Sequence, residues 1–141
     1  MARREEPVSS VQNESMELRY TPGACNIGRA EIVRRRVFGI VALGLALGLL
    51  LVLLVIGAPP LARWLVLPFL WGGFVSLEQA RRRFCVAFAY GGVRSRDDGR
   101  ERVDVGTAND RARDRRAARR MVLECGVAAA IVTFVLTLLP L

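Results

Sequence analysis

Three long apolar runs stand out along the chain, separated by segments rich in charge. Residues 37–58 contain no charged residue, residues 61–77 form a shorter run, and residues 121–141 form the last one. A helix needs about 20 apolar residues to cross the hydrocarbon core of a bilayer. A surface helix of a soluble domain would show polar positions on one face, and the first run has none. The pattern therefore predicts an all-α membrane protein with three transmembrane helices.

The first two runs predict a transmembrane hairpin within residues 37–90. Pro59 and Pro60 lie between them, and proline lacks a backbone donor and restricts the residue before it, so this pair predicts a tight turn. A secretory signal peptide is the alternative interpretation of the first run. It fits less well, because the polar segment before the run spans residues 1–36 and the run exceeds the usual length of about 15 residues.

The second run is less regular than the first. Arg63 and Trp64 lie at its start, where a snorkelling arginine and an aromatic anchor are expected at a membrane interface. Pro68 predicts a kink in this helix. The apolar stretch 84–90 is too short to cross a bilayer, so it either lies at the interface or continues the second helix.

Two polar segments complete the organisation. In the N-terminal arm, residues 1–36, Pro22-Gly23 fits the central positions of a type II turn, and residues 30–36 predict a short interfacial helix leading into the first span. Residues 91–120 predict a cytoplasmic arginine-rich loop with ten Arg and six acidic residues. Asn109 is a plausible N-cap, and we expect the helix that follows it to run directly into the third span.

Arginine clusters flank all three spans and predict one orientation. Basic residues close to a span remain in the cytoplasm, which places the N-terminus inside, the proline turn outside and the C-terminus outside. Anchoring is the simplest role of these clusters, and binding of anionic lipid headgroups is the alternative. Nucleic-acid binding is disfavoured, because aromatic residues are not interleaved and acids dilute the charge. The clusters are Arg34, Arg35 and Arg36; Arg81, Arg82 and Arg83; and Arg115, Arg116, Arg119 and Arg120.

Composition argues against an enzyme. The chain has no His, and all 21 of its basic residues are Arg. The absence of His removes the commonest general base and metal ligand near neutral pH, and the absence of Lys removes Schiff-base chemistry. We therefore expect a protein without catalytic residues, metal or cofactor. The exclusive use of arginine, whose codons are GC-rich, points to a bacterial genome of high GC content.

Three cysteines form the one candidate chemical site. Cys25, Cys85 and Cys125 match no zinc or CxxC spacing, but the expected topology places all three near the cytoplasmic face. Cysteine in such positions is most simply a small buried hydrophobic residue. The alternative is a thiol site for redox or sulfur chemistry, formed by Cys25 and Cys85, because neighbouring arginines favour the reactive thiolate.

Small residues within the spans predict close helix packing. Gly44 and Gly48 form a GxxxG motif in the first span, and such residues let helix backbones approach closely in lipid. The motif fits packing within the hairpin or a homo-oligomer. The residues expected to pack in this way are Gly44, Gly48, Gly72, Gly73, Gly126 and Ala130.

Residues 25–92 resemble a family of small bacterial inner-membrane hairpins. The resemblance is carried by Asn26-Ile27-Gly28, by Glu31 and Arg35, by the glycine-containing first span, and by Cys85 with the aromatic residues and glycine that follow it. The family includes the membrane part of YgaP-like proteins, in which the hairpin is fused to a rhodanese sulfurtransferase. It implies a hairpin that dimerises near thiol chemistry. This chain departs from the pattern through its arginine-rich loop and third helix, and it has no rhodanese domain, so no catalytic residue is carried over.

These observations favour a small multi-pass protein of a bacterial inner membrane with a non-enzymatic, accessory or structural role. Its expected partners are the lipid bilayer and either further copies of itself or other membrane subunits. A thiol-based redox or sulfur-handling protein and an anchor that binds anionic lipid are the alternative functions.

Overall fold

The fold is a row of three long helices with a small polar cap at one end. A computed structural model describes residues 21–24, 27–95 and 102–140. The elements are α2 (Arg29–Val55), the 3-10 helix η1 (Pro60–Val66), α3 (Leu67–Arg82), α4 (Val86–Gly91), β1 (Val93–Ser95), β2 (Arg102–Asp104) and α5 (Ala108–Leu138). Three helical segments, α2, η1 with α3, and α5, are long and apolar enough to cross a membrane. The predicted fold class is confirmed.

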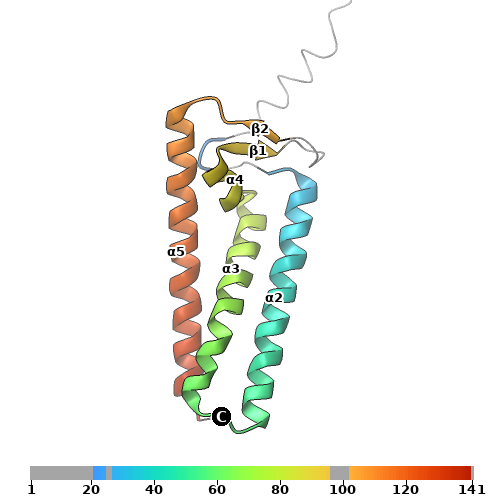
Figure 1. The fold of residues 1–141 in the computed structure, drawn as a ribbon, viewed down its shortest axis with the longest axis vertical. Coiled ribbons are helices and arrows are strands. Elements are labelled where there is room, and N and C mark those ends of the chain that lie inside the picture. Colours follow the sequence, from blue (N-terminus) through green and yellow to red (C-terminus); the bar gives the residue numbers. More distant parts are fainter. Residues whose placement is uncertain (1–20, 25–26, 96–101, 141) are drawn as a thin grey trace, which may run out of the picture.

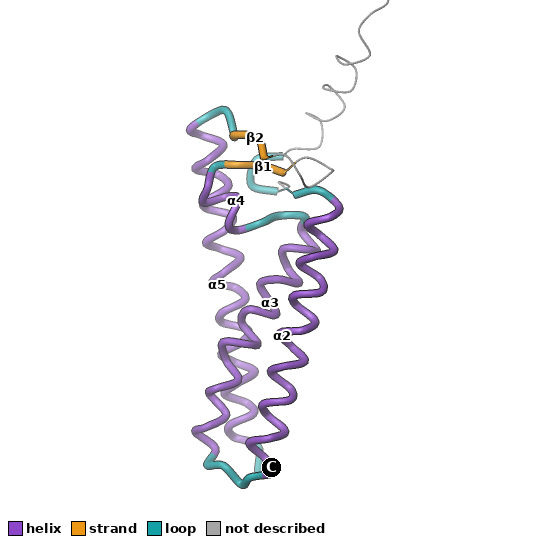
Figure 2. Tube along the Cα trace, turned by 45° about the vertical axis from the view of Figure 1, so that its right-hand side comes forward, coloured by secondary structure: helices purple, strands orange, loops and turns teal. Residues whose placement is uncertain are grey.

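Helix α3 lies between α2 and α5 (Figure 1). It packs against both neighbours, and η1 also contacts both, whereas α5 additionally packs against α4. Figure 2 shows the same row from another side, with the strands and α4 gathered at one end and the chain's C-terminus at the other. We call the end that carries α4, β1 and β2 the polar end, because the arginine clusters also lie there. Helix α2 is therefore an edge of the row, with one side facing away from the other helices.

The contact between α2 and α3 follows a seven-residue spacing of small and apolar residues. Small and apolar buried positions recur every seven residues, at Gly39, Ala46 and Leu53 on α2 and at Val66, Gly73 and Ala80 on the facing segment. A seven-residue repeat keeps one seam of each helix directed at its partner when the two helices wind around each other. This seam is the core of the hairpin.

The second span differs from the expected kinked helix. Its first seven residues form the 3-10 helix η1, and α-helical geometry begins only at Leu67. Pro68 consequently lies in the first turn of α3, where its missing amide leaves no hydrogen bond unmade. The irregularity expected at Pro68 takes the form of a change of helix type directly before this residue. The helix also continues to Arg82, beyond the predicted end at residue 77.

The segment after α3 forms a separate short helix. Arg83 adopts a left-handed conformation with φ 53° and ends α3. The amide of Phe84 then donates to the Gln79 carbonyl oxygen at 2.9 Å, and the amide of Val86 donates to the Gln79 side-chain oxygen at 3.1 Å. The chain thereby turns, and α4 packs against α5. Continuation of the second helix through residues 84–90 is therefore wrong.

The arginine-rich segment contains a β-hairpin where a loop was expected. Strands β1 and β2 pair antiparallel, with Val93 opposite Asp104 and Ser95 opposite Arg102. The amide of Val105 donates to the Gly92 carbonyl oxygen at 2.9 Å and extends this connection. As predicted, α5 runs without interruption into the third apolar run. Its N-cap is Thr107, whose hydroxyl accepts a hydrogen bond from the Asp110 amide, so the prediction of Asn109 is wrong by two positions.

Residues Thr21–Ala24 form the predicted turn and dock it on α5. The Ala24 amide donates to the Thr21 carbonyl oxygen at 3.0 Å, and Gly23 has φ +78°, as the third position of a type II turn requires. The Gly23 amide then donates to Oδ1 of the fully buried Asp114 at 2.6 Å. The turn therefore packs against a helix 91 residues further along the chain.

At the opposite end of the row, Arg63 connects η1 to the end of α5. Its guanidinium is buried and donates from Nη1 to the carbonyl oxygens of Leu136, at 2.5 Å, and Leu139, at 2.8 Å. These carbonyls belong to the last turn of α5, which has no intrahelical donors left for them, and a cation is favoured at this helix terminus. The expected snorkelling of Arg63 toward water is therefore wrong.

Candidate functional site

The fold brings all three arginine clusters to the polar end. Arg34–Arg36 lie in the first turns of α2, Arg81–Arg83 at the end of α3, and Arg115–Arg120 on the polar half of α5. All ten predicted arginines are exposed except Arg35, which is half-buried. The juxtaposition results from the antiparallel order of the helices, because each cluster flanks an apolar segment on the same side.

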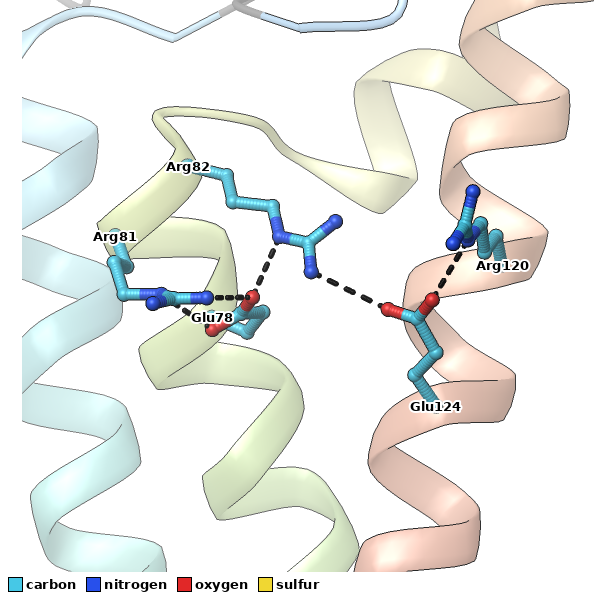
Figure 3. A network of polar contacts seen from close by, with 5 residues as sticks. All are labelled: Glu78, Arg81, Arg82, Arg120 and Glu124. Atoms are coloured by element: carbon cyan, nitrogen blue, oxygen red, sulfur yellow. Dashed lines mark hydrogen bonds and ion pairs between the residues drawn. The ribbon is translucent and has the colours of Figure 1, made fainter.

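A network of ion pairs crosses from α3 to α5 (Figure 3). Glu78 accepts two hydrogen bonds from Arg81, at 2.8 and 2.9 Å, and is also paired with Arg82. Arg82 reaches Glu124 on α5 at 3.3 Å, and Arg120 donates to Glu124 at 2.7 Å. Exposed ion pairs of this kind add little to stability, because water screens them and the long side chains lose conformational freedom. The network therefore orients the arginines more than it stabilises the fold.

Glu31 and Arg35 form a second group on the other side of α3. Glu31 is buried and pairs with Arg34 at 3.0 Å and Arg35 at 3.2 Å. Nη2 of Arg35 also donates to Sγ of Cys85 at 3.0 Å. This contact ties the first turns of α2 to the segment between α3 and α4, where the Ile27 amide donates to the Arg83 carbonyl oxygen at 3.3 Å.

The two described cysteines lie in separate hydrophobic clusters. Cys85 is fully buried with Ile27 and Phe88. Cys125 is buried with Phe84 and Met121 on the face of α5 that packs against α3 and α4. The structure does not place these two thiols in a shared site, and Cys25 falls outside the described residues. Burial keeps a thiol away from soluble reactants, and reactive cysteines are partly exposed.

Acidic and sulfur ligands are not grouped into a metal centre in the described part of the chain. No cluster of three or more His, Cys, Asp or Glu side chains occurs among residues 21–24, 27–95 and 102–140 that is placed to hold a metal ion. A closed structural metal site needs several such ligands close together. Among the described residues, the arginines are therefore the candidates for a binding site.

The most distinctive feature of the polar end is a pocket of about 650 Å³ between the Thr21–Ala24 turn, the end of α3 and α5. Four arginines line it together with apolar side chains, and its described lining contains no carboxylate. The lining residues are Pro22, Gly23, Ala24, Arg82, Phe84, Arg113, Arg116, Ala117, Arg120 and Met121.

Sequence reasoning missed Arg113 and the contribution of the turn to this pocket. Arg113, Arg116 and Arg120 follow one another by three and four residues, which is the spacing that places side chains on one face of a helix. The sequence therefore already indicated that these three arginines share a face. Nothing in the sequence indicated that the turn lines the pocket, because the contact between Gly23 and Asp114 forms only in the tertiary structure.

A second groove, of about 500 Å³, lies elsewhere on α5. It is lined by Arg111, Arg115, Arg116 and Arg119 together with Ala108 and Ala112. Arg111 is held there by a hydrogen bond from its Nε to the Val105 carbonyl oxygen at 2.8 Å. Arg116 lines both the groove and the pocket beside the turn, whereas Arg115 and Arg119 line the groove alone.

The predicted packing residues divide into two groups. Gly73 lies in the α2–α3 contact, where a Cβ atom would come 2.7 Å from Cδ2 of Leu43. Gly126 lies against the indole of Trp71, whose Nε1 donates to the Val122 carbonyl oxygen at 3.1 Å, and Ala130 is half-buried on the same helix.

Gly44, Gly48 and Gly72 form the other group. A Cβ atom at each of these glycines would meet nothing within 4 Å, because all three point away from the row of helices. The expectation that they pack within the hairpin is therefore wrong, while a role of Gly44 and Gly48 in a homo-oligomer stays a prediction. Gly39, which does contact α3, was missed as a packing residue although it precedes Ala46 by the seven-residue spacing of the seam.

No protein-family model matches the chain, and neither a curated protein nor a solved structure matches it. The resemblance of residues 25–92 to the YgaP-like hairpin family consequently stays a prediction that rests on its short motifs. The polar end and the outward face of α2 are thus interpreted from their own geometry.

Proposed function

We propose that the protein is a non-enzymatic, multi-pass subunit of a bacterial inner membrane that associates with a second copy of itself through the outward face of α2. The observation that carries this proposal is the open GxxxG motif. Gly44 and Gly48 lie one turn apart on an exposed side of α2, where a Cβ atom added at either would meet no neighbouring atom within 4 Å. In lipid, helix association depends on close van der Waals contact, and paired small residues permit it.

The position of α2 in the row supports an association at this face. Its packing partners within the fold are α3 and η1, so the side that bears Gly44 and Gly48 is available to lipid or to another helix. The glycines needed for the hairpin itself are different ones, Gly39 and Gly73. The motif at Gly44 and Gly48 is therefore unexplained by the fold of a single chain.

We also propose an orientation of the protein in the membrane. The polar end carries the arginines next to all three membrane-crossing segments, whereas the turn at the other end carries only Arg63, which is buried against α5. The bias of basic residues toward the cytoplasm assigns the polar end to that side. The C-terminus then lies at the external surface.

The test is the oligomeric state of the full chain in native membranes and in mild detergent. We expect a dimer or larger homo-oligomer for the wild type, and mostly monomer for the double variant Gly44→Leu/Gly48→Leu, measured by crosslinking and by light scattering after size-exclusion chromatography. Gly72→Leu is the matched control, because Gly72 is equally open but lies on α3. It should leave the oligomer intact.

A wild-type chain that is monomeric in both settings would refute the proposed self-association. So would an oligomer that survives leucine at both positions 44 and 48. If only the Gly72 control lost the oligomer, the interface would lie on α3 and not on α2.

A further inference from the structure

We infer that the pocket between the Thr21–Ala24 turn, α3 and α5 binds a phosphate-bearing anion, with the headgroup of an anionic phospholipid as the source that the surrounding residues favour. The pocket is distinct from the oligomer face on α2, so this inference goes beyond the proposed function. Three properties of the pocket indicate this class of ligand: the charge of its lining residues, the ion pairs that each arginine makes, and the apolar residues of its lining.

All charged residues in the described lining are arginines, and two of them, Arg82 and Arg120, are paired with Glu124 outside the lining. Arg82, Arg113, Arg116 and Arg120 line the pocket, and no Asp or Glu appears among its described lining residues. Guanidinium groups match the geometry of phosphate oxygens through two parallel N–H donors and are weakly hydrated, so they recognise phosphate better than a point charge does. A pocket with four of them selects an anion with several acceptor oxygens.

The four arginines are not equally engaged within the protein. Arg82 and Arg120 share the carboxylate of Glu124, at 3.3 and 2.7 Å, which holds both side chains in place. Arg113 and Arg116 form no ion pair or side-chain hydrogen bond with any described residue. Their donors are available to a ligand, while Glu124 links Arg120 on the same helix to Arg82 on α3.

The apolar residues of the lining point to a lipid. Phe84, Ala117 and Met121 are apolar residues of the lining beside the four arginines, and Met121 directly follows Arg120, the last arginine of α5. The pocket thus lies where the charged half of the helix meets its apolar half. A phospholipid headgroup sits at that depth in a bilayer, with its acyl chains directed toward the apolar half.

The Thr21–Ala24 turn forms the remaining side of the pocket. Pro22, Gly23 and Ala24 line the pocket, and the bond between the Gly23 amide and the buried Asp114 holds them there. Asp114 is fully buried, accepts the hydrogen bond from the Gly23 amide and is not among the residues that line the pocket. The site therefore combines residues from both ends of the sequence and exists only in the folded chain.

The experiment compares two sources of the same anion on the full chain in a mild neutral detergent. In one arm, native mass spectrometry measures how much phosphatidylglycerol and how much phosphatidylcholine each protein retains. In the other arm, inorganic phosphate is titrated against lipid-free protein and the shift in Tm is measured. The variant is Arg113→Gln/Arg116→Gln, and the control is Arg115→Gln/Arg119→Gln, which removes the same charge from the same helix but outside the pocket.

We expect the wild type and the control to retain phosphatidylglycerol in preference to phosphatidylcholine, and the Arg113/Arg116 variant to lose about tenfold or more of that preference, since only this variant removes charge-assisted hydrogen bonds to the phosphate. A phosphate-induced Tm shift lost in the same variant, without lipid retention, would support the pocket with a soluble phosphate ester as its source. Equal losses in variant and control, or no preference in the wild type, would overturn the inference, because binding would then be diffuse or absent.

Discussion

Glycine residues of the hairpin serve two different purposes at positions only a few residues apart. At Gly39 the side chain of Leu77 fills the space that a Cβ would need, and at Gly73 the side chain of Leu43 does the same. Each glycine therefore receives a leucine from the opposite helix. Gly44, by contrast, faces away from the fold with open space around it.

This difference predicts opposite responses to the same substitution. In Gly39→Ala the new Cβ would lie 2.7 Å from Cγ of Leu77 and 3.2 Å from the Gly73 carbonyl oxygen, so the Leu77 side chain or the hairpin backbone must shift. Overpacking of this kind lowers the free energy of unfolding by about 1–3 kcal/mol. Titration with sodium dodecyl sulfate in mixed micelles, followed by helical circular dichroism, measures the change.

Gly72→Ala is the control for that prediction, because Gly72 is as open as Gly44 but lies outside the proposed oligomer face. It adds the same methyl group to the hairpin in open space, and alanine is the better helix former. We expect no loss of unfolding free energy. A loss at position 72 equal to that at position 39 would contradict the assignment of Gly39 to the interhelical seam.

At the scale of the element, α5 shows how a helix start is selected among several candidates. Thr107, Asn109 and Asp110 are all residue types that favour helix N-termini. Strand β2 and the bond from the Val105 amide to Gly92 hold the chain extended up to this point. Thr107 is thus the first residue free to cap, and its hydroxyl accepts from the Asp110 amide at 3.1 Å.

We predict that Thr107→Ala destabilises the first turn of α5, while Asn109→Ala does not. Loss of a capping side chain costs about 1 kcal/mol, and the Asp110 amide loses its acceptor. Hydrogen exchange should therefore accelerate at residues 108–111 in the Thr107 variant. Protection in Asn109→Ala should match the wild type, and faster exchange there instead would restore Asn109 as the cap.

At the scale of the whole molecule, the row of helices has two unlike ends. One carries the arginine clusters, the turn docked on Asp114 and the short β-hairpin. The other is closed by the buried Arg63 on the last carbonyls of α5. This asymmetry gives the chain a single expected orientation in a bilayer.

Labelling of single cysteines in intact cells checks that orientation. In a Cys25→Ser background, Leu61→Cys places an exposed thiol in the proline turn and Arg115→Cys places one at the polar end. A membrane-impermeant maleimide should label position 61 in intact cells and position 115 only after permeabilisation. The buried Cys85 and Cys125 should add little background, and the reverse pattern of labelling would invert the topology.

The membrane-crossing segments and the course of α5 were predictable from the sequence, because both depend on local properties. A run of apolar residues long enough to span a bilayer has few alternative structures, since its backbone polar groups must bond within the segment. The type II turn at Pro22-Gly23 was predictable for a similar reason, as proline and glycine restrict the backbone directly.

Contacts between distant segments could be decided only by the tertiary structure. Which glycines face a neighbour depends on how α2 is rotated against α3, and the GxxxG spacing is the same whichever way the helix is turned. The burial of Arg63 depends on the end of α5 reaching η1, and the separation of Cys85 from Cys125 depends on the turn at Arg83. The sequence by itself determined which segments are helical and apolar, because hydropathy and backbone propensity act over a few neighbouring residues. The pocket at the polar end was decided by packing, which brought Gly23 to Asp114 across 91 residues.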